Sequence, residues 1–477
     1  MAWRYTGKNY RPFTALCDCH FGRIVITTDA EEITAENVIT ELHKALADHG
    51  VNQMQISYLD NYYRGDQPIL YRVKPNRPEV NNKVVENIAW LIVETKTAEL
   101  AGEPIQYVLH GKDEAKSDEI AKLNSLVDGE DKPYEDIELC RWRSVCGTAY
   151  RFVGHGKNKS RLLDESPFYL STLDPRDAFV VYDSDDDPLF GCSIKYTQAG
   201  KNIYWVYTNK LWFKISGDEI LDSGINGMGA IPIVEYPNNA RRISDIEITL
   251  PITDELNKMA SDRSNGIEQF VSSWVKFVNC EIDEVAFRKM RNEGALAVKS
   301  NNGAENKADV DILSQELNQT ESQVAVSDLY DKLLEIQGMS NRQKNSGGDT
   351  GSAVLLRNGF YNSEKRAELS EPIFKRAERM TLRLILNRLR IEQGVTLLPS
   401  DVEIKISRSK LDNMLTKAEV LQILLNCGID NERAIKTVSL FSDPEQVAIE
   451  SRDRMNVLYP KDANAVAPQN NNTQGIE

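Results

Sequence analysis

Apolar residues in the first third of the chain recur every three or four positions, which is the spacing of one helix face. This spacing predicts helices over about 34–49 and 83–100, and the β-branched run at 23–28 predicts a short strand. The stretch 61–68 between the helices is polar and rich in turn residues. Residues 111–137 are charged and interrupted by Gly and Pro, so they predict a surface helix with a loop.

The pattern changes between Val145 and Tyr236, where short runs of β-branched and aromatic residues alternate with Gly, Asp and Pro. Such runs begin at Ala149, Ala178, Cys192, Asn202 and Leu211. Runs of this length bounded by turn residues are typical of antiparallel strands. The sequence therefore predicts an antiparallel β unit in the middle of the chain.

Two helices joined by an insert are predicted in the second half. Apolar residues from Ile252 to Val278 form one helical stripe, equivalent to a rod of about 40 Å. A second stripe opens at Thr320 with Gln323 three residues later, the pattern of a capping box, and ends near Ile336. The pair would form an antiparallel hairpin. Because a bare hairpin cannot bury both of its faces, either a second chain or a bundle within the same subunit must cover it.

The chain then breaks sharply at residues 338–351, which contain four glycines and almost nothing that could be buried. This composition predicts an exposed loop flanked by helices. A long helix is predicted over 352–393, a strand over 402–406 and two or three short helices over 414–456. Residues 462–477 are rich in Asn, Gln and Ala and predict a disordered tail.

The composition is that of a chain able to form real cores. Its 477 residues, 41% hydrophobic and 27% charged, suggest about two to four structural units. The apolar runs are short and the N-terminus lacks an apolar segment, so we expect neither a spanning helix nor a signal peptide. Seven scattered cysteines indicate reduced thiols in a cytosol. The net charge of −15 argues against a protein that binds nucleic acid with its whole surface.

Motifs that would carry enzyme chemistry are incomplete. Residues 17–20 (Cys-Asp-Cys-His) lack the second half-site that a zinc site needs. Residues 183–187 begin like a calcium loop, but Pro188 and Ile194 stand where Gly and Glu are needed, which favours a solvated turn. The glycines of 224–229 are in the wrong order for a dinucleotide fold, and no phosphate loop or nucleophile elbow is present. We therefore predict a structural or binding protein without catalytic residues, metal or cofactor.

Several segments, taken in order, resemble the portal proteins of tailed bacteriophages, in particular the family typified by phages of Gram-positive hosts. The segments are 61–68 (Asn-Tyr-Tyr-Arg-Gly-Asp-Gln-Pro), 82–98, 147–150, 174–183, 244–247 with 254–262, and 348–357. Their order and spacing cover roughly residues 55 to 410. The first 55 residues and the region after 410 match less clearly.

The resemblance implies an α+β, mainly helical subunit that assembles as a ring, with a wing, a stem hairpin of long helices, a small α/β clip and a helical crown. The implied parts are an N-terminal extension (1–54), the wing (55–250), stem helix 1 (251–279), the clip (280–317), stem helix 2 (318–337), a tunnel loop (338–351), a long wing helix with a strand (352–410), the crown (411–461) and the tail (462–477).

The resemblance also implies a function. Such portals are dodecameric rings at the unique vertex of the capsid, assembled in the host cytoplasm, through which the genome is packaged and later ejected. The implied partners are other copies of the chain, the terminase large subunit, the head-completion adaptor, the major capsid and scaffolding proteins, and double-stranded DNA bound without sequence specificity. No membrane is implied, and hydrolysis belongs to the terminase. The acidic balance suits a channel in which strong phosphate pairing would stall DNA.

Two groups of residues are candidates for contacts in such a ring. The tunnel-loop group, predicted to meet DNA, is Asn341, Arg342, Gln343, Lys344 and Asn345. The inter-subunit group is Trp274 of the first stem helix with Arg376, Arg379 and Arg383, whose spacing places the arginines on one helix face. A disordered surface loop with incidental charge is the alternative for the first group, and DNA contact is the alternative for the arginines.

Two other functional hypotheses remain open at this point. One is a scaffolding or adaptor protein that forms no ring and binds partners through the same helical hairpin. The other is a metal-dependent nuclease built from Asp183, Asp185 and Asp187 with Glu219. A ring predicts oligomers that persist on dilution, whereas a nuclease predicts DNA cleavage that depends on divalent ions.

Overall fold

The chain divides into two compact units, which we describe separately. The first unit is formed by residues 1–24, 50–93 and 241–366, and the second by residues 25–49, 94–240 and 367–477. The computed structural model describes residues 22–75, 78, 80–110, 116–155, 166–197, 200–271, 274–278, 288, 309–313, 319–339, 360–406, 414–438, 447, 451 and 454. All structural statements below refer to these residues.

The largest sheet of the second unit has six strands in the order β1-β5-β6-β7-β8-β9. Its strands are β1 (Ile26–Thr27), β5 (Ala178–Tyr182), β6 (Pro188–Tyr196), β7 (Asn202–Thr208), β8 (Leu211–Ser216) and β9 (Glu219–Ile225). Consecutive strands from β5 to β9 pair antiparallel, and the short β1 runs parallel to β5. The predicted antiparallel β unit is confirmed, with this one parallel edge added.

Two smaller sheets complete the second unit. A three-stranded antiparallel sheet has the order β10-β3-β4, from β3 (Thr148–Gly154), β4 (Tyr169–Leu173) and β10 (Ile233–Pro237). The strand predicted at 402–406 is confirmed as β13 (Val402–Lys405), which pairs antiparallel with β2 (Gln106–Leu109).

The helices of the second unit match the predicted regions, with changes at their ends. They are α3 (Ser117–Gly129), α4 (Lys132–Cys146), most of α9 (Phe360–Gln393), the 3-10 turn η5 (Pro399–Asp401), α10 (Met414–Asn426) and α11 (Asn431–Val438). The single helix and loop predicted for 111–137 is wrong, because two helices occupy most of this region. Both form since each buries its own apolar face, including Leu123 and Leu139.

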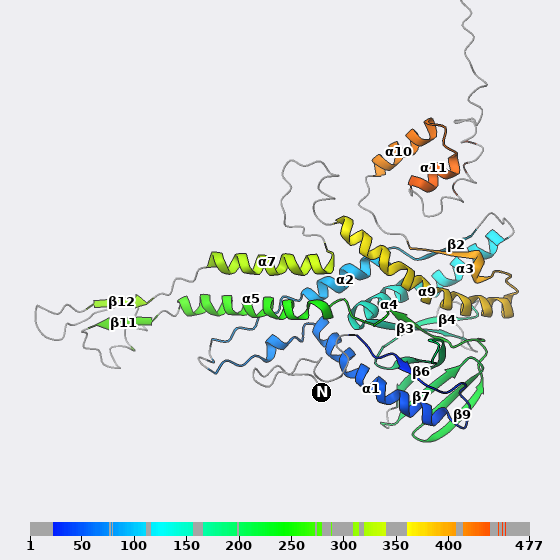
Figure 1. Cartoon of the computed structure of the whole chain (residues 1–477), viewed down its shortest axis with the longest axis horizontal. Coiled ribbons are helices and arrows are strands. Elements are labelled where there is room, and N and C mark those ends of the chain that lie inside the picture. The colour runs from blue at the N-terminus through cyan, green and yellow to red at the C-terminus, as the bar shows by residue number, and fades with distance from the viewer. Residues whose placement is uncertain are drawn as a thin grey trace, which may run out of the picture. The chain divides into compact units, whose positions relative to one another are not determined.

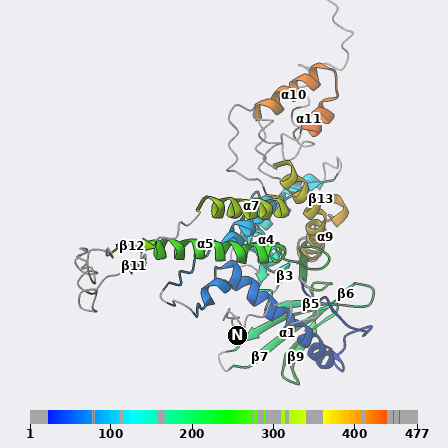
Figure 2. The same cartoon turned by 60° about the vertical axis from the view of Figure 1, so that its left-hand side comes forward.

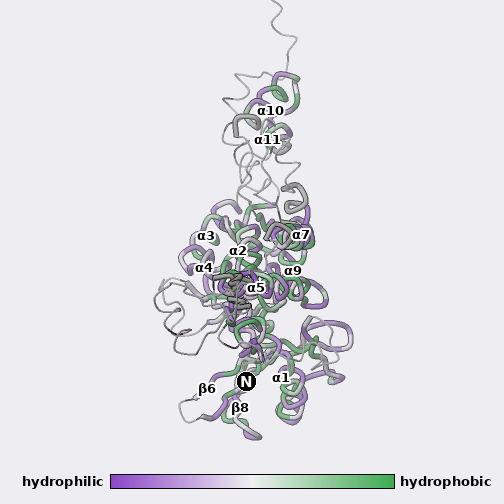
Figure 3. Tube along the Cα trace, turned by 90° about the vertical axis from the view of Figure 1, so that its left-hand side faces the viewer, coloured by the Kyte–Doolittle hydropathy of each residue, from purple (hydrophilic) through white to green (hydrophobic). Residues whose placement is uncertain are grey.

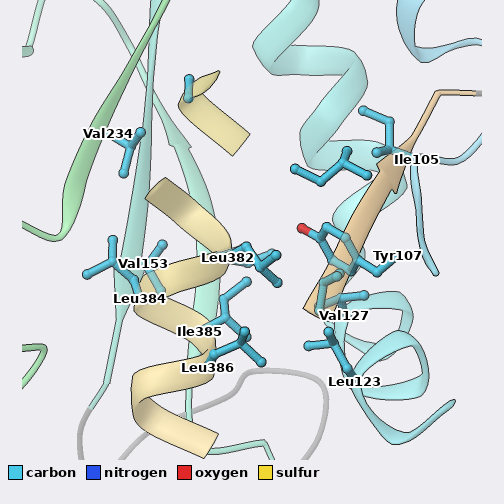
Figure 4. Close-up of a cluster of buried hydrophobic side chains, with 14 of the residues drawn as sticks. Ile105, Tyr107, Leu123, Val127, Val153, Val234, Leu382, Leu384, Ile385 and Leu386 are labelled. Atoms are coloured by element: carbon cyan, nitrogen blue, oxygen red, sulfur yellow. The ribbon is translucent and has the colours of Figure 1, made fainter. Parts of the chain in front are cut away.

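The second unit has two hydrophobic cores. In the first, shown in Figure 4, α9 contributes Leu382, Ile385 and Leu386, which lie among buried residues of the β2 and α3 region such as Tyr107 and Leu123. In the other, the N-terminal part of α1 covers the six-stranded sheet. The cores explain why α9 is amphipathic: one face is buried, and its polar face is left exposed.

Helix α1 (Val38–Tyr63) is longer than predicted. The helix expected to end near His49 continues to Tyr63 and so includes 61–63, the first residues of the stretch predicted to be rich in turns. Its second half buries Ile56, Leu59 and Tyr62, which continue the helical spacing and supply the missing packing. Figure 3 shows hydrophilic and hydrophobic residues alternating along α1.

The first unit is built around a helical hairpin (Figure 1). Its elements, apart from parts of α1, α2 and α9, are η2 (Pro68–Tyr71), η4 (Glu247–Thr249), α5 (Leu250–Val271), β11 (Trp274–Val278), β12 (Asp309–Leu313) and α7 (Gln319–Gln337). The helix predicted over 252–279 is wrong in its last part, since α5 ends at Val271 and a strand follows. The second helix is confirmed, although it begins at Gln319, so Thr320 lies inside it rather than capping it.

Helix α2 (Ile88–Ala101) begins five residues later than the predicted start at Lys83. Residues 81–87 have no helical conformation. Among the described residues no helix is long and apolar enough to cross a bilayer. The four described cysteines, Cys140, Cys146, Cys192 and Cys427, are free thiols.

Candidate functional site

Helices α5 and α7 form the antiparallel hairpin that the sequence predicts. They lie side by side in both views, and β11 and β12 lie beyond the end of α5 (Figures 1 and 2). At the base, the Gln337 side chain at the end of α7 donates hydrogen bonds to Thr249 Oγ1 (2.9 Å) and to the Asp245 carbonyl (2.7 Å), just before α5 starts. At the other end, β11 and β12 pair antiparallel, with Trp274 opposite Leu313. The chain thus leaves the hairpin through β11 after α5 and returns to it through β12 before α7.

A ladder of polar side chains along α5 holds an extended segment, residues 82–86, against the helix. The rungs are Asn257, Ser261 and Asn265, spaced four residues apart and almost completely buried. They accept hydrogen bonds from alternate amides of the segment: Glu86 N–H to Asn257 Oδ1 (2.8 Å), Val84 N–H to Ser261 Oγ (2.9 Å) and Asn82 N–H to Asn265 Oδ1 (2.6 Å).

The ladder forms because the rise of the helix between rungs matches the rise of the extended segment between alternate amides. Four residues of helix advance about 6 Å, and two residues of extended chain advance about 6.6 Å, so each rung meets the next alternate amide. This also explains the late start of α2. The amides of Asn82, Val84 and Glu86 reach the rungs only when the segment is extended, because a helical segment would not present alternate amides at the spacing of the rungs.

Carboxylates of α5 fasten further residues of the first unit to the helix. Asp254 accepts a hydrogen bond from Tyr62 Oη (2.9 Å), and Asp262 forms ion pairs with Arg72 (2.7 Å) and Lys74 (3.1 Å). Burial raises the pKa of Asp254 to about 6, against the opposing effect of the Tyr62 hydrogen bond. One side of α5 is therefore covered by its own chain.

Helix α9 is anchored in the second unit by a buried charge cluster of Lys132, Asp136, Arg151 and Glu378. Their side chains are at most 3% exposed. Lys132 Nζ lies 2.6 Å from Asp136 and 2.9 Å from Glu378, and Arg151 lies 2.6 Å from Asp136. The hydroxyls of Tyr107 (2.5 Å) and Tyr236 (2.6 Å) donate to the two oxygens of Glu378. The two positive and two negative charges sum to zero, and buried charges are stable only when they are paired in this way.

The charges of the cluster set the pKa of Glu378. Burial raises it, but the charges of Lys132 and Arg151, together with the hydrogen bonds from the two tyrosines, lower it to about 2, so that the carboxylate stays ionised inside the protein. The same burial, with the nearby Glu378 charge, raises the pKa of Tyr107 and keeps its hydroxyl a donor. The buried ion pairs of the cluster therefore fix the orientation of α9 in the second unit.

The opposite face of α9 carries the three arginines predicted to contact a neighbouring copy. Arg376, Arg379 and Arg383 are exposed and lie on one face, as their spacing predicts. No ion pair or hydrogen bond joins them to any other residue in the described part of the chain. The same face exposes Leu369 (75%) and Met380 (41%). A face that mixes arginines with exposed apolar residues is suited to a protein interface.

A family model described as "Phage portal protein, SPP1 Gp6-like" matches residues 42–456. The match spans most of the chain, including both helices of the hairpin, the β unit and α9. The chain belongs to this family of phage portal proteins. Portal proteins are head–tail connectors, and the family is named for a structural component rather than for a reaction.

Solved structures of gene transfer agent (GTA) particles are also similar to the chain. The structure described as "Neck of empty GTA particle computed with C6 symmetry" is 11% identical, with a TM-score of 0.47, and the match covers 74% of this chain and 90% of that one. "Neck of native GTA particle computed with C12 symmetry" is 11% identical, with a TM-score of 0.46 and coverage of 74% and 89%. No curated protein matches the sequence.

The other predicted sites of this portal protein have different outcomes. The tunnel-loop group, Asn341 to Asn345, and the cluster at 17–20 lie outside the described residues. Trp274 lies in strand β11 rather than in a stem helix, so its predicted helical position is wrong, and its contact with a neighbour remains a prediction. The strand forms because its backbone pairs with β12.

The acidic run at 183–187 is the turn that joins β5 to β6, as predicted. The Asp183 carboxylate accepts hydrogen bonds from the amides of Asp185 and Asp187, both at 2.9 Å. Within the part of the chain that the structure describes, no group of three or more His, Cys, Asp or Glu residues could hold a metal ion. The turn therefore gives the nuclease hypothesis no metal site.

Sequence reasoning missed both the ladder on α5 and the charge cluster under α9. The ladder has a signal in the sequence, since Asn257, Ser261 and Asn265 recur every four residues and so share one helix face. The cluster has none, because Glu378 is more than two hundred residues from its partners. Only the fold brings those charges together.

Proposed function

We propose that this portal protein forms a ring, of twelve copies in the virion, at one vertex of the capsid. DNA is packaged and ejected through the ring, while the terminase and the head-completion adaptor dock on it in turn. The match of the portal family model over residues 42–456 is the observation that carries the proposal. The net charge of −15 supports it, since a mostly acidic channel lets DNA slide without strong phosphate pairing.

The described geometry supports a division of roles along the chain. The hairpin of α5 and α7 is proposed as the stem, with the β11–β12 ladder leading to the clip at 280–317. The wing would comprise the β unit and α9, and α10 with α11 would belong to the crown. The ladder and the carboxylates of α5 fix the hairpin to its own subunit, as a stem that carries docking loads requires.

Labelling of intact phage particles tests the proposed location. A gold-conjugated antibody against an epitope tag at the C-terminus is expected to mark one vertex in particles opened to expose the portal. The major capsid protein, labelled in parallel, should appear on every face. Label distributed over many vertices, or found only on tails, contradicts a role at a unique vertex.

Substitution of the tunnel-loop cations is expected to change DNA packaging without changing ring assembly. Arg342 and Lys344 can contact phosphates without reading bases, so their replacement by Ala should weaken the grip on DNA at every sequence. The expected results are an altered packaging rate and an altered length of packaged DNA, measured in capsids that carry the variant portal. The control is Lys195→Ala with Lys201→Ala, which removes two exposed cations outside the loop and changes the net charge by the same amount. Normal rate and length in R342A/K344A contradict the assignment.

A further inference from the structure

The exposed face of α9 bears a basic stripe, which we define as Arg376, Arg379 and Arg383. At about 100° per residue the three lie within about 60° around the helix axis. They are opposite the buried residues Phe374 and Ile385, so the anchoring of α9 in its core forces them outward. The charge cluster at Glu378 fixes this orientation.

Helix α7 bears an acidic stripe with the same spacing, which we define as Asp328, Asp331 and Glu335. Both stripes step by three and then four residues. Asp328 and Glu335 are exposed and Asp331 is half-buried. The buried residues of α7, Leu333 and Leu334, lie on another face, so the stripe is outside the buried side of the helix. Lys332, beside the stripe, forms an exposed ion pair with Glu335 (2.8 Å).

Each stripe is extended by an apolar or rigid residue at the same position. Val324, four residues before Asp328, is 55% exposed, and Pro372, four residues before Arg376, is exposed. Two helices that run in the same direction would therefore match their charges and bring Val324 against Pro372. Opposite charges at matched spacing, next to apolar surface, are the features of a protein interface with a defined register.

We propose that the acidic stripe of α7 in one copy packs against the basic stripe of α9 in the next copy. The inference rests on the proposed function, because each copy then offers two different surfaces. Such head-to-tail contacts close into a ring when the rotation between copies allows it. DNA is a poor occupant for this surface pair, since the acidic stripe would repel its phosphates.

Charge reversal on either side tests the contact. The variants are R376E/R383E and D328K/E335K, which change only exposed residues and keep helix-forming side chains. The control is E219K/D222K, two exposed acidic residues of β9, which changes the net charge as D328K/E335K does. Wild type and control are expected to form rings. Each stripe variant alone should give subunits or small oligomers at the same concentration, with unchanged helicity by circular dichroism.

Two ways of restoring the charge match identify the partner. The variant with all four substitutions should form rings again, because the charges are exchanged across the contact. A one-to-one mixture of the two stripe variants should also form rings, of alternating copies, since every contact between neighbours is then complementary. Pairing within one copy predicts recovery in the fourfold variant but not in the mixture, and that result overturns the proposal.

The remaining outcomes show whether the proposed contact alone is wrong or the ring hypothesis fails as well. If either stripe variant alone keeps its rings, the ring stands and the proposed contact is wrong. If neither the fourfold variant nor the mixture recovers, the stripes have other partners and the contact is again wrong. If wild type forms no ring at any concentration, the ring and this interface both fail.

Discussion

Replacing Glu378 with Gln is expected to destabilise the second unit by about 3–5 kcal/mol. Glu378 is fully buried and balances the charges of Lys132 and Arg151 together with Asp136. Gln keeps the volume, and its single amide oxygen can accept a hydrogen bond from one of the two tyrosines, but its NH2 group cannot accept the other, and the substitution removes one negative charge. The interior is then left with two cations and a single carboxylate, and an uncompensated buried charge is among the largest single costs that a substitution can impose.

Hydrogen exchange of the backbone amides measures this loss locally. Peptides from β3 and from α9 should lose protection by a factor of about a hundred to a few thousand, since each 1.4 kcal/mol is tenfold. Glu371→Gln is the matched control, because Glu371 lies on the same helix in a partly exposed ion pair with Lys375 (2.6 Å). Its protection should change by less than about threefold.

A second substitution distinguishes lost charge balance from lost packing. Lys132→Met in the Glu378→Gln background removes the excess cation, so it should restore most of the protection, although Lys132→Met alone should be destabilising. Protection within twofold of wild type in Glu378→Gln, or no recovery in the double variant, contradicts the charge-balance account. Because the pKa of Glu378 is lowered to about 2, its contribution should be complete above about pH 4.5 and lost as the pH falls toward 2.

Replacing Glu247 with Ala is expected to destabilise the first unit by a similar amount, about 3–5 kcal/mol. The Glu247 and Arg23 side chains form an ion pair and are at most 1% exposed. Glu247 also accepts hydrogen bonds from the amides of Ser244 (2.6 Å) and Gly22 (3.3 Å). Without the carboxylate, a guanidinium is left buried without its counter-charge at the start of α5, where the hairpin of α5 and α7 begins.

The readout is again hydrogen exchange, now in peptides that cover the start of α5 and the end of α7. Protection there should fall by a factor of about a hundred or more in Glu247→Ala. Glu255→Ala is the control, since Glu255 and Lys258 form an exposed pair on the same helix (3.2 Å), expected to contribute less than about 1 kcal/mol. Equal effects of the two substitutions would show that the buried pair has no special role.

The spacing of apolar residues predicted most of the helices and strands, because the residues that must be buried recur with the period of the element. Strands β6 to β8 and helices α7 and α9 lie where the apolar spacing places them. The errors occur where a distant segment decides the conformation. Residues 83–87 have a helical pattern, but the amides of Val84 and Glu86 donate to side chains of α5. Residues Trp274–Val278 continue an apolar stripe but pair with β12.

In the candidate site, too, some features follow from local spacing and others only from contacts between distant residues. The arginines of α9 could be placed on one exposed face from their spacing alone, and the structure confirms this placement. The neutral cluster that orients the helix could not be foreseen, since Lys132, Asp136 and Arg151 meet Glu378 only in the folded chain. The acidic stripe of α7 is visible in the sequence, but only the burial of Leu333 and Leu334 shows that it faces outward.

The most direct test of a ring-forming portal is the absolute mass of the purified protein, measured by light scattering, with negative-stain electron microscopy of the same peak. The account predicts closed rings of about a dozen copies with a central hole, stable on dilution. A species of one or two copies at every concentration, with no rings in the images, would contradict it.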